Sequence, residues 1–305
     1  MTTTNSAAPL VYCVVLNWNK YEETIECVKS LRKSNYERLK IVLVDNDSGN
    51  ESVEVLRKEF PDITLLCNTQ NAGYASGNNI GIRWALENKA DYILVLNNDV
   101  IIDQNLILEM LVAIQKDQHI GVVTGKMFYK DDPNRIYSGA GKIIRWRCSG
   151  VNRGTVFGRM NQHNKECMVD YVCGALFLAR SEVFLNIGLM DEGYFMYFED
   201  LEFSRRVNSD YSMVYTPKAI AYHKSGGGTR WYNYPEVYHY YQTRNRFIVF
   251  KNDPQYYRIY VLLFTSIVTL AKSVVIFFSI FRNTSGILSR LKALWKGWRD
   301  GIKYT

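Results

Sequence analysis

The sequence lacks both of the glycine-rich signatures that mark the commonest phosphate-binding folds. No G-x-G-x-x-G motif follows the first predicted strand, which argues against a dinucleotide-binding fold. No G-x-x-x-x-G-K-S/T motif is present, which excludes ordinary P-loop chemistry. The six cysteines include no C-x-x-C pair, so we expect reduced thiols and neither disulfides nor a zinc site.

A secretory signal is also missing. Residues 1–9 are small and polar, without a basic start or an apolar core, so we expect a cytoplasmic protein. With 305 residues, of which 47% are apolar and 22% charged, the chain suits one large globular domain or a domain with an appendage.

Acidic residues are scarce near the carboxyl end. Residues 251–305 hold nine Lys/Arg and two Asp/Glu, whereas the first 250 residues hold 28 of each kind. The whole net charge of +7 therefore lies in this tail. The distribution argues against a catalytic face that binds nucleic acid, and it indicates a basic tail that meets an anionic membrane.

Apolar runs alternate with helical spacing over the first hundred residues. The sequence predicts strands at 11–16, 40–44, 63–67 and 92–96, and helices at 22–32, 53–60 and 76–88. This order predicts an α/β fold with a mostly parallel, doubly wound sheet and helices on both faces. Such sheets bind ligands beyond the carboxyl ends of their strands.

Polar residues follow each of the four predicted strands. They are Asn17, Asp45, Asn71 and Asp99. Each one alone suits a turn, because Asn and Asp favour turns, but their gathering at one edge favours a binding site. Asp99 is a hard oxygen ligand suited to Mg²⁺ or Mn²⁺ carrying a diphosphate. Asp45 can accept from a pyrimidine imide or from ribose hydroxyls.

Four separated segments carry a family resemblance. In order they are Asn17-Trp18-Asn19, Val44 to Ser48, Asn71 to Gly81, and Leu96-Asn97-Asn98-Asp99-Val100. The chain resembles the family 2 glycosyltransferases, and among them the rhamnosyltransferase-like bacterial branch. The resemblance implies a GT-A fold and a reaction that inverts the anomeric centre of the transferred sugar.

The resemblance also implies roles for individual residues. Nucleotide contacts are implied for Asn17, Asp45, Asn71, Gly77, Asn97 and Asn98. The metal motif of the family, usually written D-x-D, corresponds to Asn97-Asn98-Asp99, so the grip on Mg²⁺ or Mn²⁺ rests mainly on Asp99. His223 follows strand-like segments at 213–216 and 219–222 and falls where the family places a metal-ligating histidine. Without the resemblance, a single histidine after a strand is usually interpreted as a structural residue.

A second acidic centre lies at Glu199 and Asp200, after an aromatic run and at the start of a predicted helix. Acids in the first turn of a helix often only complement the helix dipole. The segment also matches the E-D motif of the family, which supplies the general base. The resemblance assigns that role to Asp200, with Glu199 as its supporting neighbour or as the alternative base.

Further elements are predicted between and after these motifs. We expect helices through 106–114 and 238–247 and a strand at 120–124. Residues 138–142 and 153–159 are interpreted as basic loops, and residues 169–180 as one apolar strand interrupted by Gly174. The glycine-rich segment after Lys224 is expected to form a mobile, lid-like loop, with Trp231, Tyr232 and Tyr234 closing over a sugar.

The tail contains an apolar run and a basic amphipathic segment. Residues 259–281 include only one charged residue, Lys272, and are long enough to span a membrane. From Ile287 the apolar residues form one helical stripe that bears Trp295 and Trp298, with Arg290 and other basic residues mainly off it. Attachment to the membrane surface, a membrane span and packing against protein remain three alternatives.

Together these features predict a GT-A domain at 1–253 and a membrane-associating helical tail at 254–305. We expect a metal-dependent, inverting glycosyltransferase that moves a sugar, with rhamnose favoured, from a dTDP- or UDP-sugar to a glycan or lipid-linked glycan. The expected location is the inner face of the cell membrane. A sugar nucleotidyltransferase and a non-catalytic membrane adaptor are the alternatives.

Overall fold

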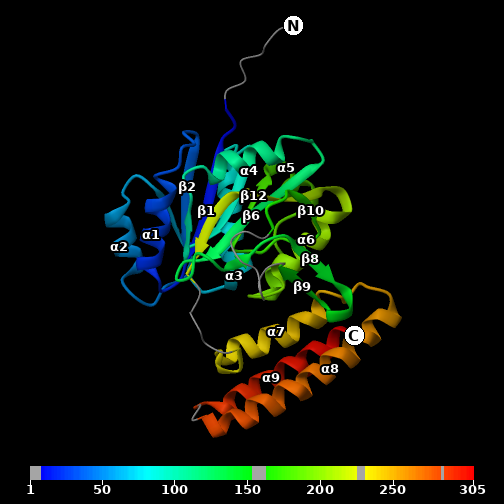
Figure 1. Ribbon diagram of the computed structural model, residues 1–305. Coiled ribbons are helices and arrows are strands. Elements are labelled where there is room, and N and C mark those ends of the chain that lie inside the picture. Colours follow the sequence, from blue (N-terminus) through cyan, green and yellow to red (C-terminus); the bar gives the residue numbers. More distant parts are fainter. Residues whose placement is uncertain (1–7, 153–162, 225–230, 283–284) are drawn as a thin grey trace.

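The computed structural model describes residues 8–152, 163–224, 231–282 and 285–305. A central sheet with helices on both faces stands above a layer of three helices (Figure 1). The strands are β1 Val11–Asn17, β2 Leu39–Asp45, β3 Thr64–Cys67, β4 Tyr92–Asn97, β5 Val100–Ile102, β6 Ile120–Tyr129, β7 Ile136–Ser138, β8 Gly141–Ile144, β9 Ser149–Asn152, β10 Cys167–Val169, β11 Leu176–Arg180 and β12 Ser212–His223. The helices are α1 Tyr21–Leu31, α2 Ser52–Glu59, α3 Gly73–Glu87, α4 Leu106–Ile114, α5 Ser181–Ile187, α6 Glu199–Asp210, α7 Glu236–Ile248, α8 Gln255–Phe278 and α9 Ile287–Gly301.

The first four strands form the predicted parallel sheet. β1 pairs in parallel with β2 and β4, and β2 pairs in parallel with β3. Alternate residues of β1 enter opposite cores: Val11, Cys13 and Val15 pack with α1, α2 and α4, whereas Tyr12 and Val14 pack with α3, α5 and α6. Because both faces are covered, the strands read as continuous apolar runs.

The other half of the sheet is mixed. The full order is β10-β12-β6-β11-β4-β1-β2-β3, and β11 is antiparallel to both β4 and β6. Residues 169–180 therefore do not form one strand: β10 pairs with β12 at the far edge, and β11 lies in the centre. The loop predicted at 138–142 is also wrong, because β7 pairs with β6 and β8 forms a hairpin with β9. Such short strands depend on their partners and carry little local signal. The predicted loop at 153–159 and the glycines that follow Lys224 lie outside the described residues.

The three C-terminal helices form one layer below the carboxyl edge of the sheet (Figure 1). α7 packs against α8 and α9, and the turn between α7 and α8 contains the predicted domain boundary after Asp253. The predicted stripe of α9 exists, but Leu294 on it is fully buried, and Ile287 and Leu291 pack beside it. The placement of Arg290 off this stripe is wrong: the side chain is buried and donates to the carbonyl of Tyr232. Trp231 and Tyr232 also pack against this layer.

The exposed apolar face of the layer belongs to α8. Its inner side holds Tyr257, Val261, Thr265, Thr269 and Ile276. Its outer side exposes Tyr256, Ile259, Tyr260, Leu263, Ile267, Leu270, Val274, Val275, Phe277 and Phe278. α8 is long and apolar enough to cross a membrane, and 22% of its most apolar 18-residue stretch is buried inside the protein. Monomeric soluble proteins rarely expose an apolar surface this continuous.

Candidate active site

The carboxyl ends of β1, β2 and β4 meet at one edge of the sheet. Asn17 at the end of β1 lies in register with Asp45 at the end of β2, and Leu16 lies in register with Asn97 of β4. The parallel pairing therefore brings together polar residues that lie far apart in the sequence, as predicted.

Asn17 and Asp45 form a buried hydrogen-bonded pair. The Asn17 Nδ2 donates to Asp45 Oδ2 at 2.7 Å. The Ser48 hydroxyl donates to the same oxygen at 2.7 Å, and the Ser48 amide donates to Asp45 Oδ1 at 2.9 Å. Asp45 is only 1% exposed, so its carboxylate fixes the shape of the loop that follows β2.

Asn71 orders the neighbouring turn. Its Oδ1 accepts from Asn46 Nδ2 at 2.9 Å and from the amide of Gly73 at 3.0 Å. Gly77 lies inside α3, where a Cβ would come within 2.5 Å of the Leu16 side chain. The need for glycine at position 77 thus follows from the packing of α3 on β1, which is a different requirement from contact with a nucleotide.

Asn97 and Asn98 are held by different neighbours. The Tyr74 hydroxyl lies 2.9 Å from Asn97 Oδ1 and donates to the carbonyl of Gly174 at 2.7 Å. The Asn98 Nδ2 donates to Thr24 Oγ1 at 3.0 Å. Tyr74 thereby links the end of β4 to the segment that precedes β11.

Asp99 and His223 face one another across the sheet edge. Asp99 lies in the turn between β4 and β5, and β5 pairs antiparallel with the end of β12, with His223 opposite Val100. This register leaves His223 Nε2 3.4 Å from Asp99 Oδ1. The imidazole also stacks on the ring of Tyr137, with the centroids 4.0 Å apart.

The chemistry of this pair fits a divalent metal. Asp99 Oδ1 is buried and has no hydrogen-bond partner in the described structure. Burial lowers the pKa of His223, although Asp99 opposes the shift, which favours the neutral imidazole that ligates metals. Burial raises the pKa of Asp99, and His223 partly offsets this. No cluster of three or more His, Cys, Asp or Glu side chains occurs in the described ranges, so a metal here would take further ligands from a substrate and water.

Three donors hold the Asp200 carboxylate in place. Its Oδ2 accepts from the Tyr171 hydroxyl at 2.7 Å and from the Gly174 amide at 3.1 Å. Its Oδ1 accepts from the Leu201 amide at 2.8 Å. These donors stabilise the charged form, although burial still raises the pKa of Asp200 above its ordinary value.

Glu199 lies beside Asp200 in a less polar environment. Its Oε2 is buried without a hydrogen-bond partner among the described residues. Burial, and then the charge of Asp200, raise the pKa of Glu199 well above its ordinary value. Of the two acids, Asp200 is therefore the one whose charged form is stabilised by hydrogen bonds.

A strained segment presents this pair of acids. Phe195, Tyr197 and Phe198 have φ values of 64°, 66° and 72°, which non-glycine residues rarely adopt. The Asn245 amide of α7 donates to the carbonyl of Tyr194 at 3.0 Å and to that of Tyr197 at 2.7 Å. The layer below the sheet thus holds the segment in place.

A pocket of about 170 Å³ opens beside Asp200. Its wall includes Ser149 and Gly150 of β9, Tyr197, and Gln242 of α7. The pocket therefore lies between the catalytic edge of the sheet and the layer of three helices.

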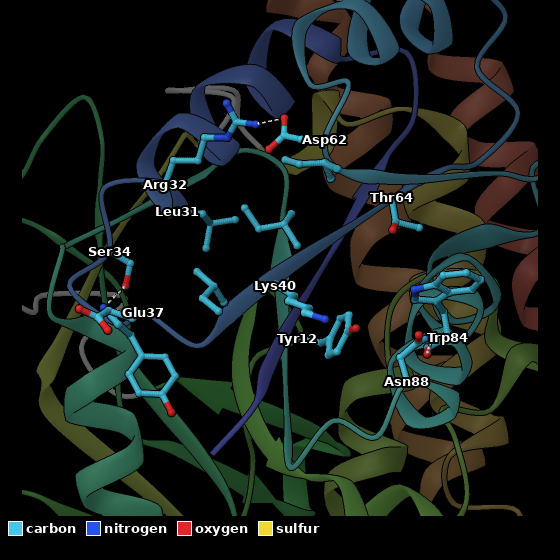
Figure 2. A pocket seen from close by; sticks show the side chains of 14 residues that line it. Tyr12, Leu31, Arg32, Ser34, Glu37, Lys40, Asp62, Thr64, Trp84 and Asn88 are labelled. Atoms are coloured by element: carbon cyan, nitrogen blue, oxygen red, sulfur yellow. Dashed lines mark hydrogen bonds and ion pairs between the residues drawn. The ribbon is translucent and has the colours of Figure 1, made fainter. Parts of the chain in front are cut away.

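A larger cavity of about 630 Å³ lies near the amino-terminal ends of β2 and β3 (Figure 2). Arg32 and Asp62 form an ion pair at its rim, and Lys40 points over the ring of Tyr12. The charges of Arg32, Asp62 and Lys40 are already paired or stacked, and the cavity lies away from the polar strand ends. It does not belong to the candidate site.

Four site residues escaped sequence analysis. Tyr74, Tyr137, Tyr171 and Asn245 make contacts that join segments remote in the sequence. The sequence marked only their neighbour Gly174, as a glycine that interrupts a predicted strand. In the structure the Gly174 amide donates to the Asp200 carboxylate.

This fold, with acidic and amide residues at the carboxyl edge of a mixed sheet, is that of the GT-A glycosyltransferases. Two solved structures support the likeness in fold. GalNAc-T7 with UDP, GalNAc and Mn²⁺ has a TM-score of 0.64 at 16% identity, covering 83% of this chain and 50% of that one. The mannosyltransferase PcManGT from Pyrobaculum calidifontis with GDP-Man and Mn²⁺ has a TM-score of 0.58 at 12% identity, covering 97% and 88%.

The sequence profile of glycosyl transferase family 2 matches residues 12–188, and the chain belongs to this family. The match includes Asn17, Asp45, Asn71 and Asp99, whereas Glu199, Asp200 and His223 lie beyond it.

Three curated relatives agree with this assignment. A low-salt glycan biosynthesis hexosyltransferase of Haloferax volcanii is 27% identical, over 77% of this chain and 73% of the relative. The dTDP-rhamnosyl transferase RfbF of Shigella flexneri is 24% identical, over 80% of each chain. An N-acetylglucosaminyl-diphospho-decaprenol L-rhamnosyltransferase of Mycobacterium tuberculosis is 24% identical, over 64% of this chain and 70% of the relative.

Proposed function

We propose that this glycosyltransferase moves a sugar from a nucleoside-diphosphate sugar to a glycan or lipid-linked glycan and inverts the anomeric centre. The main support is one juxtaposition. The Asp99–His223 pair and the Asp200 carboxylate lie at the same sheet edge, joined through Asn97, Tyr74 and Gly174. A pair of residues that can bind a metal suits the departure of a diphosphate. A hydrogen-bonded carboxylate at the same edge suits the activation of a hydroxyl.

The protein side chains then divide the work. Asp45, Asn17 and Asn71 order the loops where the nucleotide would bind, with Asn97 and Asn98 at the neighbouring end of β4. Asp200 takes the proton from an acceptor hydroxyl as that oxygen attacks the anomeric carbon. Tyr171 and the Gly174 amide orient the carboxylate, and one displacement without a covalent sugar–enzyme species inverts the centre. Asp99 and His223 would hold Mg²⁺ or Mn²⁺, which when bound supplies charge stabilisation to the departing diphosphate.

Rhamnose is the donor sugar that we favour. Two of the relatives carry rhamnosyl transfer in their names, and one of these names a dTDP-sugar. A dTDP- or UDP-sugar also suits the asparagine side chains at this edge of the sheet, because their amides can pair with the donor and acceptor groups of a pyrimidine.

We infer that the acceptor lies at a membrane surface. One relative is named for a diphospho-decaprenol acceptor. The outer side of α8 offers lipid a continuous apolar surface, while its inner side packs against α7 and α9 along its length. A helix with one protein-covered face suits an in-plane position in the bilayer interface better than a span. We therefore infer peripheral attachment to the inner face of the cell membrane.

A panel of nucleotide-sugars tests the proposal. With an acceptor present, release of the nucleoside diphosphate and appearance of the glycosylated product are expected for one donor above the others. Release of inorganic pyrophosphate from a nucleoside triphosphate and a sugar phosphate would identify a nucleotidyltransferase instead. Failure of every donor to turn over with glycan and lipid-linked acceptors would refute the transferase proposal.

A further inference from the structure

Two cations lie between the helices below the active site without an anionic partner. They are Arg246 of α7 and Lys272 of α8. The Arg246 guanidinium carbon lies 5.8 Å from the ring centroid of Phe198 and 5.7 Å from that of Phe264. The Lys272 Nζ lies 5.8 Å from Trp231 and 5.9 Å from Tyr238. Within the described residues no carboxylate pairs with either cation, and the buried Nε of Arg246 has no hydrogen bond.

Neighbouring cations also influence one another here. The pKa of Lys272 falls to about 8, because of burial and then because of Arg246. The pKa of His239 falls to about 4, because of burial and then because of Lys272 and Arg290. Aromatic rings attract cations but carry no net charge, so they leave this positive potential without a neutralising ion. A fold that encloses two such charges is complementary to an anion.

This positive region adjoins the pocket beside the candidate base. Arg246 contacts Phe198, the residue directly before Glu199 and Asp200. Gln242 lies one helical turn before Arg246, on the same face of α7, and lines the pocket that also contains Asp200. A molecule with a hydroxyl at Asp200 would therefore extend past Gln242 toward Arg246.

The same path leads to the apolar surface. Lys272 belongs to α8, and Val275, one helical turn after it, is 42% exposed and borders the outer apolar side of the helix. From Asp200 outward, the protein thus offers a polar pocket, then two cations without an anionic partner, and then an exposed apolar helix. A sugar joined through phosphate to a lipid chain has the same order of polarity.

We propose that Arg246 and Lys272 bind the phosphate of a lipid-phosphate-linked acceptor, with its sugar beside Asp200 and its lipid chain on the outer side of α8. This subsite rests on the proposed glycosyl transfer and adds the chemical class of the acceptor. The planar guanidinium can bind two phosphate oxygens at once, and the ammonium supplies a further donor.

Transfer kinetics with two matched acceptors test the subsite. Both carry the same sugar and the same chain length, one joined through a diphosphate and the other as an uncharged alkyl glycoside, in neutral detergent micelles. Arg246→Gln and Lys272→Gln should each raise KM for the diphosphate acceptor about tenfold relative to the alkyl glycoside, with kcat little changed. Lys272→Arg keeps the positive charge, so its ratio of KM for the diphosphate acceptor to KM for the alkyl glycoside should equal that of the wild type. Lys292→Gln, on an exposed lysine of α9, is the matched control and should leave the ratio unchanged.

The outcomes separate the subsite from the transferase proposal. Equal KM changes for both acceptors, or none, would overturn the subsite while glycosyl transfer stands. If no donor turns over, titration of the diphosphate-linked lipid into wild type and variants still decides the matter: weaker binding by the variants supports the subsite, and equal binding refutes it. If the variants lose affinity for anionic vesicles but keep the KM ratio, the cations face bilayer phosphates and the proposal is wrong. Thermal unfolding of each variant checks that it is folded.

Discussion

The Tyr171 hydroxyl lies 2.7 Å from Asp200 Oδ2, and it joins a residue just after β10 to the first turn of α6. With the Gly174 amide on the same oxygen, this contact fixes the direction in which the carboxylate can accept a proton. The relationship makes Asp200 the residue on which the proposed chemistry depends most.

The first prediction concerns this base. Asp200→Asn should lower kcat by about 10²–10⁴, the usual loss when acid–base help is removed, and should keep nucleotide-sugar affinity. Tyr171→Phe removes only the orienting hydrogen bond, so its effect on kcat should be smaller. Single-turnover transfer and a separate donor-binding titration measure the two effects. Near-normal turnover by Asp200→Asn would remove this residue from the mechanism.

The second prediction concerns the metal. Asp99→Ala and His223→Ala should each weaken divalent-dependent binding of the nucleoside diphosphate, because each removes one of the two proposed protein ligands. Calorimetric titration with and without Mn²⁺ provides the measurement. His119→Ala, which changes a histidine outside the site, is the control. Full activity of the wild type in excess chelator would show that the site works without a metal.

The third prediction concerns the nucleotide pocket. Asp45→Ala should raise KM for the donor more than KM for the acceptor, because the loop after β2 loses the hydrogen bonds to Ser48. The variant should also be less stable, since the buried Asn17 amide loses its carboxylate partner. Steady-state kinetics and chemical denaturation test both effects. An unchanged KM for the donor would argue against a nucleotide pocket at this position.

The fourth prediction uses the buried Glu199. Its raised pKa means that the unfolded chain releases this proton at a lower pH than the folded protein does, so the wild-type fold loses stability as pH rises from the ordinary pKa of glutamate toward the folded pKa. Glu199→Gln should therefore increase the free energy of unfolding at mildly alkaline pH, by on the order of 1 kcal/mol for each unit of the pKa rise.

This gain should shrink as pH falls and vanish below the ordinary pKa of glutamate, where both states of the wild type are protonated. Urea denaturation across the pH range measures it. A gain that is independent of pH would assign the stabilisation to packing.

The fifth prediction concerns the membrane. The protein should sediment with anionic vesicles, and high salt should weaken this binding without abolishing it, because basic side chains add about 1 kcal/mol each only while unscreened. The paired substitutions Leu263→Glu and Ile267→Glu, on the outer side of α8, should reduce binding at both salt concentrations.

Leu185→Glu, an equally exposed leucine on α5, is the control and should bind as the wild type does. A chain that ignores vesicles and instead dimerises through α8 would contradict the membrane proposal.

Much of the first half of the fold could be predicted from the sequence. The strands β1, β2 and β4 are buried on both faces and therefore appear in the sequence as continuous apolar runs, which were enough to identify them. Because the carboxyl ends of parallel strands meet at one edge, the sequence also brought Asn17, Asp45 and Asp99 to one site. The start of α6 at Glu199 was marked by its acids and by the apolar contacts that follow.

The second half depended on tertiary pairing. β7, β8 and β10 are three or four residues long, too short for a periodic signal, and they exist because β6, β9 and β12 offer them partners. The contact of His223 with Asp99 required the antiparallel register of β5 on β12, which no local pattern encodes.

The sequence by itself determined the parallel core, the acids and amides at its edge, and the apolar and basic character of the tail. Only the tertiary structure decided which face of the tail remains exposed. Periodicity shows that a helix has an apolar side, but it does not show what covers that side. Most of the α9 stripe packs against α7 and α8, although Leu288 and Trp295 on it are exposed. The outer side of α8 is open along its length, and so α8 carries the main surface expected to meet the membrane.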